Sequence, residues 1–276
     1  MNTASKYPQF RKKGVNDRFG LSNDQFAVKG KQIRIPNLGW VRMREELRFV
    51  GKMLSAKVFN RGGRWFVSIA VEIADAITLA KKTGKQTGID LGIADLITLS
   101  DGTKIKAPKP LKAKLKKLKR LSRQLSRKQK GSNNRAKAKA KLSRLHLQIS
   151  NIRKDALHKL TTGLVSEYDV VAIENLNTKG MMQNRKLSRA ISDLGFYEFK
   201  RQLVYKANQY VITAIELDRC SPSFITCSYC CHLLTKDELP LLVRRWQCPS
   251  CQQANDRDIN ASINILQHAD KVLTHQ

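Results

Sequence analysis

Two Cys-x-x-Cys pairs constrain this chain more tightly than any other feature of its sequence. Cys227 and Cys230 form the first pair, and Cys248 and Cys251 form the second. Each pair makes a tight turn that offers two thiolates, and two such turns can complete a tetrahedral zinc site. Because four thiolates leave no position open for a substrate, we expect a structural zinc ion. Cys231 directly follows the first pair and could take the place of Cys230, and a redox pair is the alternative use of these thiols.

Positive charge dominates the composition and indicates a polyanionic partner. Lys and Arg number 52, Asp and Glu number 22, and the formal net charge is +30. Each phosphate that such a surface neutralises releases counterions, so nucleic acid is the partner we expect. A membrane surface would instead require an amphipathic helix with a Trp, Phe or Leu face. The most basic region, residues 110–160, is nearly free of aromatic side chains.

The sequence carries no signal for membrane insertion or secretion. No run approaches the roughly 18–20 apolar residues of a membrane span. Residues 1–14, MNTASKYPQFRKKG, lack the apolar centre of a signal peptide. We therefore expect a cytosolic protein whose thiols stay reduced, with Cys220 as a free thiol.

Residues 25–73 show the alternation and the turn residues of short β-strands. Gly30 and residues 36–39, PNLG, separate the first runs, and residues 60–63, NRGG, join two longer runs as a hairpin. These strands predict a partial β-barrel domain over residues 1–78.

From residue 86 onwards, strand patterns are followed by helix patterns. Residues 86–107 predict three strands, and residues 110–160 predict a basic αα-hairpin with its break at residues 131–134. Further predicted elements are a strand at 170–174, a helix at 194–210, a strand at 211–218 and a final helix at 255–269. This order predicts an α/β fold with a sheet of mixed strand direction.

Three carboxylates occupy positions where α/β proteins build their sites. Asp90 lies in an apolar strand, Glu174 ends another, and Asp258 opens the final helix. Sites form beside the carboxyl ends of strands in such sheets, so the three acids could meet. Gathered acids raise one another's pKa, and divalent cations such as Mg²⁺ would relieve the conflict and could support phosphoryl displacement. Any one of these acids, taken alone, is more often a cap or a turn residue.

Four segments occur in the order found in TnpB (OrfB)-type proteins of bacterial insertion sequences, which this chain resembles. They are GIDLGIADLITLSDG, VVAIENLN, the paired cysteines and NDRDINASINIL. The resemblance implies an RNase H-like fold with a RuvC-like nuclease domain. It also implies a metal-dependent, RNA-guided DNA endonuclease of the bacterial cytosol and nucleoid, with DNA and a guide RNA from the same element as partners.

The resemblance assigns roles to particular residues. Asp90, Glu174 and Asp258 match the catalytic acids that would bind Mg²⁺ or Mn²⁺, with Asp256 as the alternative third acid. The paired cysteines match a zinc ribbon, residues 220–254, inserted between the nuclease segments 79–219 and 255–276. The basic hairpin matches a helical insertion that lies against nucleic acid. Its expected phosphate contacts are Lys112, Lys116, Lys119, Arg123 and Arg127.

Two features depart from the family pattern. Cys231 stands where the family usually has glycine. Members usually carry a sizeable segment before the stretch that corresponds to residues 7–13, so the chain resembles a member shortened at its N-terminus, with impaired cleavage. Two alternatives stay open: a remnant or regulator that binds DNA or RNA without cutting, and a transposase that acts in DNA recombination.

Overall fold

The computed structural model describes residues 17–73, 82–218, 224–235, 237–240 and 242–274, which fall into two compact units. The first unit combines the chain up to residue 76 with residues 117–148, and the second combines residues 77–116 with 149–276. Residues 7–14 and Cys220 lie outside the described residues. Within the described ranges, no helix is long and apolar enough to cross a membrane.

The first unit contains two antiparallel sheets of three strands each. One sheet has the order β1 (Arg18–Ser22), β5 (Lys52–Arg61), β6 (Arg64–Glu72). The other has the order β2 (Ala27–Lys29), β3 (Gln32–Ile35), β4 (Gly39–Arg42). The sheets share one apolar core, in which Leu21, Ile33 and Val58 are buried.

The hairpin predicted at residues 60–63 is confirmed. Gly62 and Gly63 connect β5 to β6 with φ of +59° and +73°. A two-residue turn that matches the twist of its strands needs positive φ at both positions, which glycine adopts without a steric penalty. The strand β1 was not expected, because its five residues, RFGLS, lack a clear alternation of apolar side chains.

Two helices form the predicted basic hairpin. They are α1 (Pro110–Ser126) and α2 (Asn133–Glu167). Arg135 closes the connection, since its Nη1 donates to the carbonyls of Leu125 and Lys128, both at 2.9 Å. At the other end, Asp193 accepts the N–H groups of Leu111 and Lys112 at 3.0 and 2.9 Å, which satisfies the first turn of α1.

The second unit is built on a five-stranded sheet of mixed direction, as the sequence predicted. Its order is β11 (Thr213–Leu217), β10 (Val170–Glu174), β7 (Gln86–Leu91), β8 (Ile97–Leu99), β9 (Lys104–Ile105). β10 pairs in parallel with both β11 and β7, whereas β7, β8 and β9 pair antiparallel. The carboxyl ends of β7 and β10 therefore meet at the same edge of the sheet.

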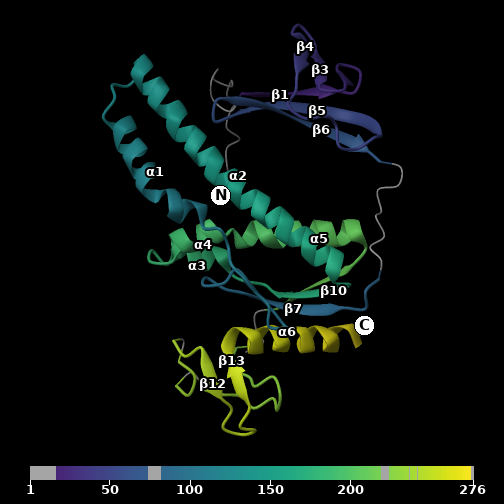
Figure 1. The fold of residues 1–276 in the computed structure, drawn as a ribbon, viewed down its shortest axis with the longest axis vertical. Coiled ribbons are helices and arrows are strands. Elements are labelled where there is room, and N and C mark those ends of the chain that lie inside the picture. Colours follow the sequence, from purple (N-terminus) through teal and green to yellow (C-terminus); the bar gives the residue numbers. More distant parts are fainter. Residues whose placement is uncertain (1–16, 74–81, 219–223, 236, 241, 275–276) are drawn as a thin grey trace, which may run out of the picture. The chain divides into compact units, whose positions relative to one another are not determined.

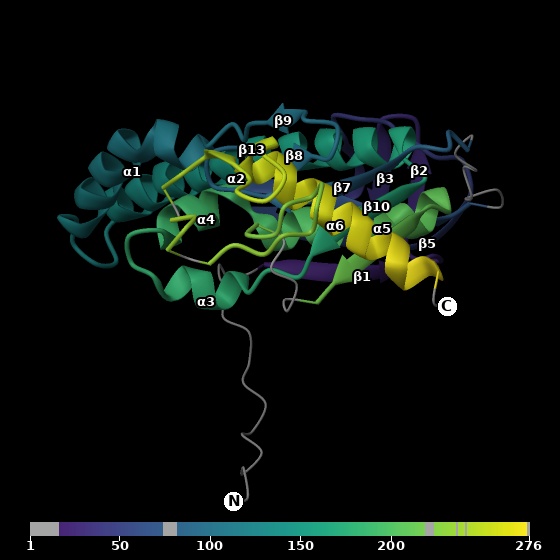
Figure 2. The same ribbon diagram turned by 90° about the horizontal axis from the view of Figure 1, so that it is seen from below.

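Helices cover both faces of this sheet (Figures 1 and 2). One face packs against α4 (Ser188–Leu194), α5 (Phe196–Tyr210) and the second half of α2, with Ile89, Phe199 and Leu157 in a continuous core. The other face packs against α6 (Arg257–Thr274), where Ala172 and Ile265 are buried together. This α/β architecture, with a sheet between helical layers, is the fold class expected from the sequence.

Glycine lets α6 approach the sheet closely. A Cβ atom at Gly88 of β7 would lie 2.1 Å from the Ser262 carbonyl oxygen and 2.7 Å from the Leu266 nitrogen. Leu266 of α6 therefore faces the sheet, and Ile259 lies beside Gly102. The short helix α3 (Thr178–Gln183) and the strands β12 (Arg245–Gln247) and β13 (Ala254–Asp256) complete the described elements.

Candidate active site and cysteine cluster

Asp90 and Glu174 lie on the same face of the central sheet. Side chains alternate along a strand, so Asp90 shares the face of Gly88, which packs against α6. By the same alternation Glu174 shares the face of Ala172, which also packs against α6. Both acids stand at the carboxyl ends of adjacent parallel strands. The apolar residues that bury each strand thus bring two carboxylates to one edge of the sheet.

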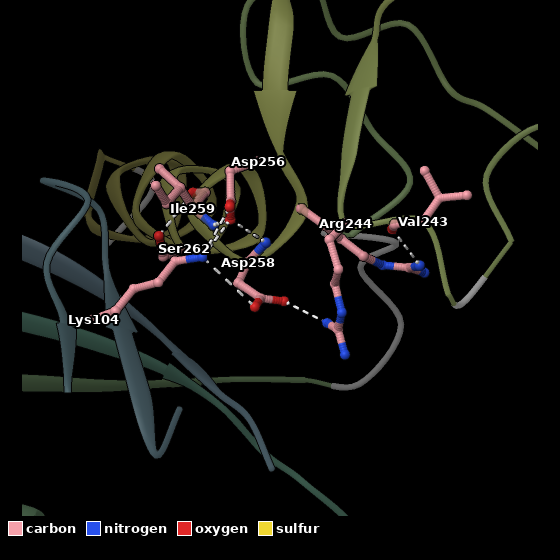
Figure 3. A network of polar contacts seen from close by, with 8 residues as sticks. Lys104, Val243, Arg244, Asp256, Asp258, Ile259 and Ser262 are labelled. Carbon is pink, nitrogen blue, oxygen red and sulfur yellow. Dashed lines mark hydrogen bonds and ion pairs between the residues drawn. The ribbon is translucent and has the colours of Figure 1, made fainter. Parts of the chain in front are cut away.

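Asp258 is the second residue of α6 and reaches the same edge from the helix. Its side chain is 19% exposed. Asp256 has a different place, because its Oδ1 accepts the N–H groups of Asp258 and Ile259 at 3.1 and 3.2 Å (Figure 3). Asp256 therefore caps the helix, and its carboxylate is also held by Lys104 at 2.8 Å.

The protonation of Asp90 reflects this crowding. Burial raises the pKa of Asp90 to about 7, with further contributions from the charges of Asp258 and Glu174. Burial also raises the pKa of Glu174. The charges of Asp258 and Glu174 thus disfavour the ionised state of Asp90. A divalent cation bound among the three carboxylates would neutralise this repulsion. The three carboxylates are not drawn into a single tight cluster, since among the described residues only four cysteines bring their ligand atoms within 4.8 Å of one another.

Two cations beside these acids were not identified from the sequence. Arg244, which precedes β12, donates from Nη1 to Asp258 at 3.0 Å, and its charge also lowers the pKa of Asp90 (Figure 3). Lys104 of β9 lies 3.9 Å from Asp258. The side chain of Arg244 is 60% exposed, so it can also reach a ligand. No spacing rule links Arg244 to Asp258, because the pairing depends on how residues 224–256 fold back onto α6.

The paired cysteines converge as the sequence predicted. The Sγ atoms of Cys227, Cys230, Cys248 and Cys251 all lie within 4.8 Å of one another. Cys227 and Cys251 are 3.7 Å apart, and Cys230 and Cys248 are 3.6 Å apart. Sulfurs at these separations suit a tetrahedral zinc ion with Zn–S distances of about 2.3 Å.

Cys231 is not part of this cluster. Its N–H donates to the Cys227 carbonyl at 2.9 Å, and its φ is +60°. This is the left-handed conformation that glycine adopts most easily, which agrees with the glycine that the resemblance leads us to expect at this position. Cys231 is exposed, and it is Cys230 whose sulfur lies with the other three cysteines of the cluster.

The basic residues predicted to contact phosphate are displayed along α1. Lys112, Lys116, Lys119 and Arg123 are exposed and recur at intervals of three and four residues, so they share one side of the helix. Arg127 is exposed just beyond the helix. Lys119 and Arg123 also line a hollow between α1 and α2, together with Leu142 and His146. The hairpin therefore presents a charged ridge with few groups that could read base edges.

Comparison with protein families gives two matches. The model OrfB_IS605, described as "Probable transposase", matches residues 68–185. The model described as "Cas12f1-like, TNB domain" matches residues 196–265, which include the four clustered cysteines and Asp258.

Two curated relatives match over most of the chain. A protein of Streptomyces pristinaespiralis named "Putative RNA-guided DNA endonuclease" is 44% identical over 75% of this chain and 50% of its own length. The Escherichia coli protein named "Putative RNA-guided DNA endonuclease InsQ" is 35% identical over 97% of this chain and 69% of its own length. The chain thus spans between half and about two thirds of these relatives.

Solved structures share the fold. One of them is titled "Cryo-EM structure of the Cas12f1-sgRNA-target DNA complex", and its protein superposes with a TM-score of 0.54 at 18% sequence identity. The similarity covers 78% of this chain and 45% of that protein.

Proposed function

Because this chain belongs to the TnpB (OrfB) family, we propose that it is an RNA-guided DNA endonuclease that cleaves phosphodiester bonds with a RuvC-like acid site. The observation that carries the proposal is the placement of Asp90 and Glu174 on the sheet face that α6 covers, with Asp258 in the first turn of that helix. The names of the two curated relatives support the same activity. We also propose that the chain acts on DNA in the cytosol.

Asp90, Glu174 and Asp258 would hold Mg²⁺ or Mn²⁺, hard cations that prefer carboxylate oxygens. When bound, such ions would polarise the scissile phosphate and activate water. The protein contributes the ionised carboxylates, and Asp90 must give up its proton for this purpose. Arg244 neutralises Asp258 and stands beside Asp90, so its exposed guanidinium can meet the negative charge of a phosphate at the same place.

The four clustered cysteines would hold a structural zinc ion, and the exposed ridge of α1 would hold the nucleic-acid backbone. Zinc would fix residues 224–256, because the described apolar clusters of the second unit are built from other parts of the chain. The lysines of α1 act as point charges and attract DNA and guide RNA without selecting a sequence. We also propose the boundaries expected from the sequence: a barrel at 1–78, nuclease segments at 79–219 and 255–276, and a zinc ribbon at 220–254.

The first prediction tests the acid site. Asp90→Asn keeps the size of the side chain and removes its charge, so cleavage of a matched target with co-purified RNA should fall by at least about 10³-fold in Mg²⁺. Binding of nucleic acid should change less than about twofold, because Asp90 is buried and the phosphate ridge of α1 is intact. Asp155→Asn, an exposed carboxylate on α2, is the matched control and should cleave normally.

The same assay separates the alternatives. A chain that binds nucleic acid but shows equal, negligible cleavage with and without the Asp90 carboxylate is a non-cleaving remnant or regulator. Strand joining that survives Asp90→Asn would favour the transposase alternative. Either outcome contradicts the proposed nuclease.

A further inference from the structure

Helix α6 has a second interface, formed by amide side chains. Asn260, Asn264 and Gln267 are spaced by four and three residues, so they lie on one side of the helix. Ser262, Ile265 and Ala269 lie on the side that packs against the sheet. The side of the helix that carries the amides faces the first cysteine pair instead. One helix therefore connects the sheet edge that holds the acids to the cysteine cluster.

All three amides bond to the backbone of the first cysteine turn. Asn260 accepts the N–H of Ser228 at 2.8 Å and donates to the Thr226 carbonyl at 2.7 Å. Asn264 donates to the same carbonyl at 2.7 Å. Gln267 donates to the Ser228 carbonyl at 3.0 Å. We call these three residues the amide row. The row hydrogen-bonds to the residues on both sides of Cys227, whose side chain is fully buried.

The amide row starts close to the acid site. Asn260 is two residues beyond Asp258 in the same helix and is 1% exposed. From the other side, Arg244 bonds to Asp258 and belongs to the segment between the two cysteine pairs. Asp258 is thus fixed from two directions by groups whose positions depend on the fold of residues 224–256. A change in the cysteine turn can therefore reach the acid through the hydrogen bonds of the row and the first turn of the helix, in which Asn260 follows Asp258 by two residues.

We propose that the amide row couples zinc binding at the four cysteines to divalent-metal binding at the acids. Zinc orders the backbone at residues 226–228, the row transmits that order to the first turn of α6, and Asp258 is held where it can share a cation. Asn260, Asn264 and Gln267 are then positioning residues. The inference rests on the proposed function, because it requires Asp258 to bind the catalytic cation.

The coupling can be measured without cleavage. Binding of Mn²⁺ to the full chain, followed by electron paramagnetic resonance, is compared with zinc present and with zinc removed by a chelator. Zinc should tighten Mn²⁺ binding by at least about fivefold. The coupling between two binding equilibria is reciprocal, so Mn²⁺ should raise the affinity for zinc by the same factor. Competition for zinc with a coloured chelator at equilibrium measures this change.

Neutral substitutions in the row test the route. Asn264→Leu and Gln267→Met keep side-chain size and charge but remove the hydrogen bonds to Thr226 and Ser228. Each should retain one zinc ion, yet bring the coupling factor close to one. His268→Ala is the matched control, because this exposed residue follows Gln267 on the same helix, and it should leave the factor unchanged. Asn264→Gln, which keeps the donor, should restore part of the coupling.

The outcomes separate this inference from the proposed function. Asp90→Ala should abolish Mn²⁺ binding and leave the strong signal of free Mn²⁺ unchanged, and if Mn²⁺ binds that variant as it binds the native chain, the acid site itself is wrong. If Asp90→Ala abolishes binding but zinc has no effect on Mn²⁺ in the native chain, the coupling is wrong and the acid site stands. A coupling factor that Asn264→Leu and Gln267→Met leave intact would also overturn the role of the row.

Discussion

At the residue scale, Asp90 shows what a carboxylate that is buried beside other acids costs the folded protein in stability. Its carboxyl is buried beside two other acids, and its pKa is raised to about 7 from an ordinary value of 3.8. Between these pH values the folded chain binds a proton that the unfolded chain has released. The free energy of unfolding must therefore fall as the pH rises through this range, by up to about 4 kcal/mol.

The raised pKa of Asp90 makes the stability of the chain depend on pH. In the presence of a chelator that removes Mg²⁺, the native chain should be less stable at pH 8 than at pH 5.5. Asp90→Asn should remove most of that difference and should be the more stable protein at pH 8. Added Mg²⁺ should raise the melting temperature of the native chain at pH 8 and have little effect at pH 5.5, because protons then compete for the site. Thermal unfolding at both pH values measures all three effects.

Asp155→Asn serves as the control for an ordinary carboxylate, since Asp155 is exposed and pairs with Lys159 on one turn of α2. Its pH dependence should match that of the native chain. A native chain that is equally stable at pH 5.5 and pH 8 without metal would contradict the assigned burial of Asp90.

At the element scale, α6 is the part on which both sites depend. It packs against β7 through Gly88, is capped at its first turn by Asp256 and carries the amide row. Gly88 makes this packing possible because the Ser262 carbonyl occupies the space where a Cβ would be, at 2.1 Å. Backbone at that distance cannot move aside as a flexible side chain can.

Gly88→Ala should therefore displace α6. We expect a decrease of about 1–3 kcal/mol in the free energy of unfolding and a loss of cleavage, because Asp258 moves with its helix. Gly163→Ala is the matched control, since Gly163 lies within α2 and a Cβ there meets nothing within 4 Å. That substitution should stabilise the chain by about 1 kcal/mol. Denaturant unfolding compares the two, and a Gly88→Ala chain as stable as the native one would refute the close packing.

The elements that sequence could predict are those with strong local signals. The glycine pair at 62–63 identified a hairpin, and the leucines of α1 at helical spacing identified a basic helix. Asp90 and Glu174 were recognisable because Asp90 lies within an apolar run that must be buried and Glu174 ends another. The short helices α3 and α4 were missed, because six or seven residues hold too few turns for a period to appear.

Arg244 and the amide row could not have been predicted, because their partners are distant in sequence. Arg244 meets Asp258 only once the second cysteine pair has folded back. Asn260 and Asn264 look like ordinary polar residues of a helix until Thr226 is placed beside them. Neither the pairing of Arg244 with Asp258 nor the bonding of the amides to Thr226 has a fixed sequence spacing, so no sequence motif predicts them.

At the scale of the whole molecule, the charge of +30 sets how the chain meets its partners. Lys and Arg outnumber Asp and Glu by 52 to 22, and the helix α1 has no carboxylate in its seventeen residues. Binding to nucleic acid should therefore be driven by counterion release and depend steeply on salt.

Replacing Lys112, Lys116, Lys119, Arg123 and Arg127 by Gln should weaken binding of all DNA sequences alike. The slope of log affinity against log salt should become shallower by about 0.9 for each duplex phosphate that the variant no longer neutralises. Exchanging Lys and Arg at the same five positions keeps the charge and is the control, with an unchanged slope. Fluorescence anisotropy over a salt series measures both, and weaker binding restricted to one DNA sequence would contradict a backbone-binding role.

The separation of the acids along the chain has a consequence for biosynthesis. Asp90 and Asp258 are joined in space only after α6 docks on β7, and the ribosome makes the second of them long after the first. At about 5–20 residues per second the delay is roughly 10–30 seconds. Throughout that interval β7 and β10 have no helix over one face, so the nascent chain exposes apolar surface that a chaperone can hold. Asp258 is also still missing, so the acid site that we propose would be incomplete until α6 has been made.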